Sequence, residues 1–237
     1  VYALVKKQAV DTVIILAPYH RARLNGIALD THQYWQTPLG NLRVNQTFNQ
    51  LLKQQLPASD IVNAPAQEKE HAIEVQLPFL QTIYQHPPSI VPIMINQAQY
   101  SSALAQALAS SLKTYEKNHN VLIFASTDLS HYLPANSAEK KDKQTIQFIQ
   151  RMNGKTLASA LAQKANLMCG DIAVLTLIKT LQQLAPTSEL HILQSRHSGQ
   201  VTGDNSRVVG YLSAVILAPQ KTFIVKDKQD LVSLAKK

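Results

Sequence analysis

The sequence is poor in cysteine, in glycine and in long apolar runs. Its one cysteine, Cys169, excludes an internal disulfide and with it a small disulfide-stabilised secreted scaffold. No segment approaches the roughly 18 consecutive apolar residues that a membrane-spanning helix needs. With seven glycines and no glycine-rich phosphate-binding motif, nucleotide binding through such a loop is not expected. A G-x-S-x-G elbow is also missing, which disfavours a serine hydrolase.

The remaining composition is that of a globular chain that can form a core. Apolar residues make up 45% of the 237 positions, and 23 Lys and Arg against 15 Asp and Glu give a net charge of +8. The basic residues are scattered in short clusters without interleaved aromatic residues, so binding of nucleic acid is not favoured. The first residues lack the apolar stretch of a signal peptide, and we expect a soluble, cytoplasmic protein that does not bind membranes.

Short apolar runs alternate with helical patterns, which predicts a layered α/β fold. Residues 12–17 and 121–125 are continuous apolar runs rich in β-branched residues, as in strands that are buried on both faces. Further strands are predicted at 89–95, 190–194 and 208–217, the last long enough to cross the middle of a sheet. Three-to-four residue apolar spacing predicts helices at 45–54, 78–85, 101–116, 138–152, 155–163 and 171–184.

The chain shows no internal repeat and no linker of Gly, Ser or Pro. We therefore predict a single domain over residues 1–218, built on a mixed, mainly parallel sheet flanked by helices. Residues 219–237 form a charged tail that could begin a following segment.

Two polar segments follow the predicted strands directly, where open α/β sheets place their sites. His20 ends the segment APYH after 12–17, and Asp128 and His131 lie in STDLSHY after 121–125. A carboxylate three residues from an imidazole can orient it or share a metal ion with it. The structural alternatives are a loop histidine at position 20 and a helix N-cap at 126–128.

A third polar segment precedes the predicted helix at 78–85. Glu70, His71 and Glu74 form E-H-x-x-E, which is not the zinc-protease motif because that motif needs two histidines on one helical face. Pro78 prevents one unbroken helix, so the acidic residues should lie in the turn entering a helix at Leu77. The structural alternative is that Glu70 and Glu74 stabilise the N-terminus of that helix.

The fourth segment is MCGD, residues 168–171. Gly170 and Asp171 are typical of a turn and an N-cap, which places Cys169 just before a helix N-terminus, where a thiolate is favoured. The alternative is an inert core cysteine. A soft thiolate together with imidazoles and carboxylates at strand ends would suit Fe(II), Cu or Zn with an open coordination position, although spacing alone does not show that these residues converge.

Taken in order, six segments resemble the Memo-like family, also described as AmmeMemoRadiSam system protein B. They are ILAPYH, ALDTHQYWQTPLGNLRVN, EHAIEVQLPFL, STDLSHY, MCGD and GDNSRVVGYLSAV, and they span most of the chain up to Leu217. The resemblance implies a fold similar to that of class III extradiol dioxygenases, with a central pocket. In metal-binding members of the family, two histidines and one cysteine hold iron or copper there.

Carried over to this chain, the resemblance implies His20 and Cys169 as metal ligands. Asp128 and His131 would lie beside the metal, and His71 would be the pocket histidine, with Glu74 as its acidic neighbour. The second metal histidine of the family belongs to a P-H-A-G-Y segment upstream of the region in hand. The start at Val1 leads us to expect that the natural protein continues upstream; the alternative is a member that lacks one ligand. APYH also departs from the family's GPSH.

The resulting prediction is a metal-dependent oxidoreductase holding Fe(II) or Cu. In it, His71, Asp128 and His131 would be the catalytic acid/base groups beside a metal on His20 and Cys169. Two other functions stay open: a non-catalytic adaptor that binds a peptide or partner in the same pocket, and a metal-handling protein. The resemblance implies a radical SAM protein and AmmeMemoRadiSam system protein A as partners, and an unidentified small-molecule or peptide ligand.

Overall fold

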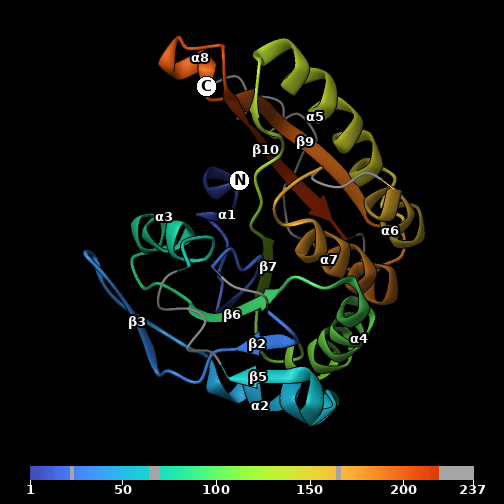
Figure 1. Ribbon diagram of the computed structural model, residues 1–237. Helices are drawn as coiled ribbons and strands as arrows, with labels where there is room; N and C mark the ends of the chain where they lie inside the picture. The colour runs from blue at the N-terminus through green and yellow to red at the C-terminus, as the bar shows by residue number, and fades with distance from the viewer. Residues whose placement is uncertain (22–23, 64–69, 164–166, 219–237) are drawn as a thin grey trace.

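A five-stranded sheet lies at the centre of the computed structural model, which describes residues 1–21, 24–63, 70–163 and 167–218 (Figure 1). Its strand order is β5-β2-β6-β1-β7. Strands β1–β6, β1–β7 and β2–β5 pair in parallel, and only β2–β6 is antiparallel within this sheet. The strands are β1 (Thr12–Ala17), β2 (Ile27–Leu29), β5 (Ile61–Asn63), β6 (Ser89–Ile95) and β7 (Val121–Ala125). The predicted mainly parallel sheet is confirmed.

Strand β1 shows why the central strands are continuous apolar runs. All six of its residues are buried. Ile14 and Leu16 pack into one hydrophobic cluster, while Val13 and Ile15 pack into another. Because successive side chains of a strand point to opposite faces, both faces of this strand must be apolar.

Helices cover both faces of the central sheet, as predicted. The first hydrophobic cluster is completed by α2 (Gln46–Gln55), α4 (Ala98–Tyr115) and α7 (Asp171–Leu184), whose apolar residues lie at helical spacing. The second is completed by α3 (Leu77–Ile83) and by Leu42 of the hairpin β3 (Tyr34–Thr37) and β4 (Gly40–Arg43). None of the helices in the described residues is long and apolar enough to cross a membrane.

A second, antiparallel sheet has the order β8-β10-β9. It consists of β8 (His131–Leu133), β9 (Glu189–His197) and β10 (Val208–Leu217), and α5 (Ala135–Gln150) runs along it (Figure 1). Strand β10 is its middle strand, as its length predicted. The remaining helices are α1 (Tyr2–Val5), α6 (Gly154–Gln163), α8 (Gly199–Thr202) and the 3₁₀ turns Ala58–Asp60 and Glu74–Gln76.

The bounds of β1, β6, β7, β10 and α7 agree with the sequence predictions residue for residue. The short strands β2, β3, β4, β5 and β8 were not predicted. Each has three or four residues, which is too few to show a period. The predicted tail, 219–237, lies outside the described residues.

The contact between Gly210 and Asp142 tests the packing of α5 on the second sheet. Asp142 is buried on α5, and its Oδ1 accepts a hydrogen bond of 2.9 Å from the backbone N–H of Ser130. A Cβ atom on Gly210 would overlap the other carboxylate oxygen of Asp142. Glycine is therefore needed for this close approach.

We expect Gly210→Ala to lower the free energy of unfolding by about 1–3 kcal/mol, because the carboxylate must move away from Ser130. Urea denaturation followed by circular dichroism measures the change. Gly154→Ala is the matched control, since its Cβ would meet the side chains of Lys179 and Gln182, which can shift. Equal stability of wild type and Gly210→Ala would contradict the packing described.

Candidate functional site

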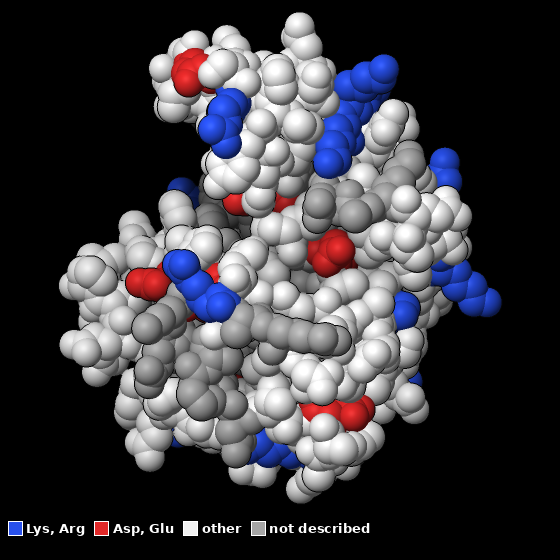
Figure 2. All heavy atoms as spheres, viewed as in Figure 1, with Lys and Arg blue, Asp and Glu red and all other residues white. Residues whose placement is uncertain are grey.

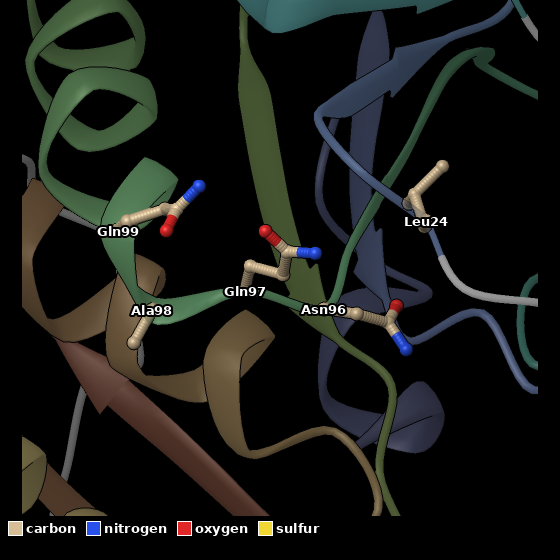
Figure 3. A pocket seen from close by; sticks show the side chains of 5 residues that line it. All are labelled: Leu24, Asn96, Gln97, Ala98 and Gln99. Carbon is tan, nitrogen blue, oxygen red and sulfur yellow. The ribbon is translucent and has the colours of Figure 1, made fainter.

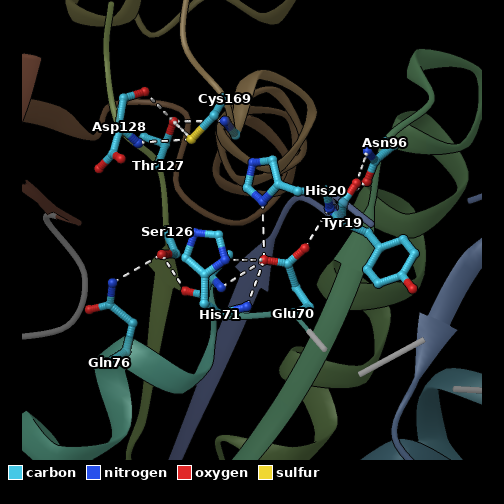
Figure 4. Close-up of polar contacts among 12 residues, drawn as sticks. Tyr19, His20, Glu70, His71, Gln76, Asn96, Ser126, Thr127, Asp128 and Cys169 are labelled. Carbon is cyan, nitrogen blue, oxygen red and sulfur yellow. Dashed lines mark hydrogen bonds and ion pairs between the residues drawn. The ribbon is translucent and has the colours of Figure 1, made fainter. Parts of the chain in front are cut away.

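The candidate site lies where β1 and β7 end side by side. The two strands are parallel neighbours, with Leu16 opposite Ala125. The backbone N–H of Ser126 continues the pairing by donating to the carbonyl of Leu16 at 2.8 Å. The segments that carry His20 and Asp128 therefore leave from the same edge of the sheet (Figure 4).

A buried carboxylate, Glu70, organises one half of this site. Its side chain is fully shielded from solvent, and Oε1 accepts hydrogen bonds from the backbone N–H groups of His71 at 2.8 Å and Ala72 at 2.9 Å. Oε2 accepts from the backbone N–H of His20. Three backbone N–H groups thus compensate for the burial of one charge.

The same carboxylate orients two imidazoles. Nδ1 of His20 lies 3.0 Å and Nδ1 of His71 lies 3.3 Å from Oε1 of Glu70. The two rings stack with centroids 5.3 Å apart and an angle of 21° between their planes. Burial alone would raise the pKa of Glu70, but hydrogen bonds from the backbone and ring of His20 and from Ala72 outweigh it and lower the pKa.

An ionised carboxylate only accepts hydrogen bonds, so Nδ1 of His20 carries the proton in its contact with Glu70. Nε2 of His20 and Nε2 of His71 then lie on the sides of their rings away from Glu70 (Figure 4). This is the arrangement that carboxylates impose on metal-binding histidines in proteins.

The other half of the site is formed by Asp128, His131 and Cys169. The backbone N–H of Asp128 donates to Sγ of Cys169 at 3.0 Å, and the backbone N–H of Cys169 donates back to the carbonyl of Asp128 at 3.1 Å. Nε2 of His131 lies 3.6 Å from Oδ2 of Asp128. One possible ligand atom of each residue lies within 4.8 Å of the other two.

Gly170 allows the segment of Cys169 to pack closely against residues 126–127. Its N–H donates to Oγ1 of Thr127 at 2.8 Å, and a Cβ atom would lie 2.5 Å from the carbonyl oxygen of Ser126. Gly170, rather than the predicted Asp171, is the N-cap of α7; Asp171 is the first helical residue. Cys169 therefore precedes a helix N-terminus, as predicted.

The five predicted site residues fall into two groups of possible ligands near the ends of β1 and β7. His20 and His71 share a group with Glu70, whereas Cys169 belongs to the group of Asp128 and His131. Ser126 links the halves, because its hydroxyl donates to the carbonyl of Ala72 at 2.6 Å. Figure 4 draws the imidazole of His20 between Glu70 and Cys169.

The geometry decides against two of the structural alternatives. Glu70 contacts two histidines and the backbone rather than the N-terminus of α3, which begins at Leu77. Glu74 lies exposed in the 3₁₀ turn before that helix, as predicted. Residues 126–128 do not begin a helix, since β8 follows them. The sequence analysis did not predict that Glu70 orients the two histidines. The signal that could have indicated this role is its position directly before His71.

A hollow of about 480 Å³ lies between β6 and α4, near the loop that follows β1 (Figure 3). Leu24, Asn96, Gln97, Ala98 and Gln99 line it. The amide of Asn96 bonds both the N–H and the carbonyl of Tyr19 at 2.7 Å, directly before His20. In the space-filling view the face shown is hollowed between the regions of α8 and α3 (Figure 2).

The pKa of the Cys169 thiol is raised, whereas its position before a helix N-terminus predicted a lowered pKa. Burial raises its pKa most, the negative charge of Asp128 raises it further, and the hydrogen bonds from Asp128 and Thr127 only partly oppose them. The expectation of a favoured thiolate is therefore wrong for the metal-free chain, because desolvation outweighs the helix.

We expect slow alkylation of Cys169 by iodoacetamide at pH 7.5 in chelator-treated protein, several-fold slower than that of an exposed thiol. Asp128→Asn should speed it up, because it removes the negative charge and keeps the backbone donor. Mass spectrometry at timed intervals measures the rate. Faster alkylation of the wild type than of Asp128→Asn would contradict the electrostatics described.

Glu70→Gln should lower the free energy of unfolding by about 2 kcal/mol at pH 7, because an amide N–H would face backbone donors. Since folding lowers the pKa of Glu70, its contribution is complete above the unfolded value of about 4.3 and is lost as the pH falls through the folded value. The difference between wild type and Glu70→Gln should therefore narrow from pH 7 to pH 3.5 in urea denaturation.

The exposed Glu74 supplies the control for that experiment, because Glu74→Gln is the same change a few residues away. It should alter stability by less than about 0.5 kcal/mol at either pH. A Glu70→Gln difference that stays constant with pH would show that Glu70 is not ionised in the folded protein.

Sequence comparisons agree with the predicted resemblance. The family model described as Memo-like protein matches residues 1–215. A MEMO1 family protein of Sulfurisphaera tokodaii is 32% identical over 214 residues, covering 90% of this chain and 74% of that protein. A MEMO1 family protein of Methanocaldococcus jannaschii is 34% identical over 208 residues, covering 86% of this chain and 71% of that protein.

Among solved structures, an uncharacterized protein from Escherichia coli K12 overlaps 84% of this chain and 85% of its own, with a TM-score of 0.49 and 13% identity. The family rests on the sequence matches, which extend over nearly the whole described chain. This chain belongs to the Memo-like family.

Proposed function

We propose that this chain is a metal-binding redox protein that holds iron or copper and acts as an oxidoreductase. The observation that carries the proposal is the buried Glu70. It is hydrogen-bonded to Nδ1 of His20, lies 3.3 Å from Nδ1 of His71, and leaves Nε2 of each ring available to a metal ion. Histidine ligands of metal ions are commonly held in this way by a carboxylate.

The donor set fits these metals. Imidazole nitrogen together with a thiolate suits iron and copper, whereas calcium and magnesium prefer oxygen ligands alone. His20 and Cys169 would hold the metal, as the family resemblance implies. Binding would require the Cys169 thiol to release its proton. Because burial raises the pKa of this thiol, the proton would leave only when the metal binds. When bound, the metal would supply electron exchange with dioxygen.

Asp128 and His131 would move protons at the edge of the site. Their side chains lie 3.6 Å apart and are 45% and 37% exposed, so they reach both the site and solvent. An imidazole beside a carboxylate can accept or donate a proton near neutral pH. His71, held on Glu70 next to His20, is the third proposed acid/base group.

A peptide-binding function is the second candidate, and the hollow next to His20 favours it. Gln97 and Gln99 line this hollow with uncharged groups that can hydrogen-bond a peptide backbone. Association with a radical SAM protein and AmmeMemoRadiSam system protein A stays a prediction.

Elemental analysis after anaerobic loading with Fe(II) or Cu(I) and desalting tests the metal proposal. We expect the wild type to retain iron or copper, and His20→Ala and Cys169→Ala to retain several-fold less, because each removes a ligand. His86→Ala, which changes an exposed histidine outside both groups, is the control and should match the wild type.

Retention that is unchanged in His20→Ala and Cys169→Ala would place any bound metal elsewhere. A wild type that is empty after both loadings would sink the redox proposal and leave peptide binding as the better function.

A further inference from the structure

Tyr132, the residue after His131, has an unusual backbone. Its φ angle is +58°, a left-handed backbone conformation that residues other than Gly, Asn and Asp rarely adopt. Met152 is the other non-glycine residue with positive φ among the described residues, but it follows the C-terminus of α5, where this conformation is common. Tyr132 lies inside a strand, so its conformation needs another reason.

The conformation belongs to a β-bulge between β8 and β10. Leu133 pairs with Val208 and His131 pairs with Val209, so that Tyr132 is an extra residue without an opposite partner. Glycine usually occupies the left-handed position of such a bulge. The chain keeps a large aromatic residue there, although glycine would remove the strain.

The bulge brings the Tyr132 ring against that of His131. Consecutive residues of a regular strand point to opposite faces, yet the rings of His131 and Tyr132 contact each other with centroids 5.7 Å apart. His131 in turn lies 3.6 Å from Asp128. Tyr132 is 64% exposed and therefore lies outside the core, at the edge of the site through its contact with His131.

Arg207 completes this feature. Its guanidinium carbon lies 5.2 Å from the centroid of the Tyr132 ring. In the part of the chain that the structure describes, no carboxylate forms an ion pair with Arg207; the nearby Asp204 bonds Ser206 instead. A guanidinium that lies over a ring keeps its N–H edge free, and that edge matches a carboxylate with two parallel hydrogen bonds.

We propose that Tyr132 and Arg207 form a carboxylate-binding lip, which anchors the acid group of a ligand whose other end reaches His131 and Asp128. This proposal rests on the proposed function, because the lip would bind the ligand of that same site. It narrows the ligand class to molecules that carry a carboxylate. Tyr132 positions the guanidinium through the ring contact, and Arg207 binds the acid group.

Benzoate and its neutral analogue benzamide are the probes, titrated into the full chain by ligand-observed NMR, with and without loaded Fe(II). We expect benzoate to bind both forms, and Arg207→Gln to weaken benzoate roughly tenfold or more while leaving benzamide unchanged, because bidentate hydrogen bonds to a charged group are strong. Arg151→Gln is the matched control, since Arg151 also lies over a ring, that of Phe148 at 5.6 Å.

The variant Tyr132→Gly distinguishes a role of Tyr132 in ligand binding from a role in stability. We expect this variant to be at least as stable as the wild type in urea, because glycine relieves the left-handed conformation, and to bind benzoate more weakly. Tyr132→Asn, which also tolerates this conformation, should behave in the same way. Lower stability of both variants would show that the bulge serves packing, and would overturn the role of Tyr132.

Loss of metal binding and loss of the lip can be told apart. Benzoate that binds metal-free protein and depends on Arg207 supports the lip even where the chain retains no metal. Benzoate that binds only Fe(II)-loaded protein and ignores Arg207→Gln would overturn the lip, since the metal would then be its site. Absence of benzoate binding to either form would overturn it as well.

Discussion

The whole candidate site depends on the buried negative charge of Glu70. A carboxylate without partners would be too costly to bury, so the backbone of His20, His71 and Ala72 must turn toward it. That requirement fixes the loop after β1 against residues 70–72. The carbonyl of Ala72 then receives the hydroxyl of Ser126, which leads into the segment that holds Cys169. One desolvated charge thus places both halves of the site.

The sheet contributes the edge on which this network is built. Two neighbouring parallel strands, β1 and β7, end next to each other, and their loops carry the polar side chains. The second sheet contributes β8, which carries His131 and the bulge at Tyr132. Strand ends therefore position His20, Asp128 and His131, while Cys169 is held at the start of α7.

The sequence predicted an element correctly where its apolar pattern fits only one kind of secondary structure. The run 12–17 is a continuous buried stretch and the helix 171–184 buries apolar residues at helical spacing, so their bounds follow from the sequence. His20 and Cys169 were placed at element ends for the same reason. The role of Glu70 did not follow, since an acidic residue near a helix suggests a dipole contact unless its burial is known. The thiol of Cys169 was misjudged because desolvation depends on tertiary packing.

The site is assembled from parts that lie far apart along the chain. The contacts of His20 with Glu70, Ser126 with Ala72 and Asp128 with Cys169 span 50, 54 and 41 residues. Contacts of such separation close large loops and form slowly during folding, after the local helices. The site therefore cannot close before residue 169 has been synthesised, and His20 leaves the ribosome long before its neighbours exist.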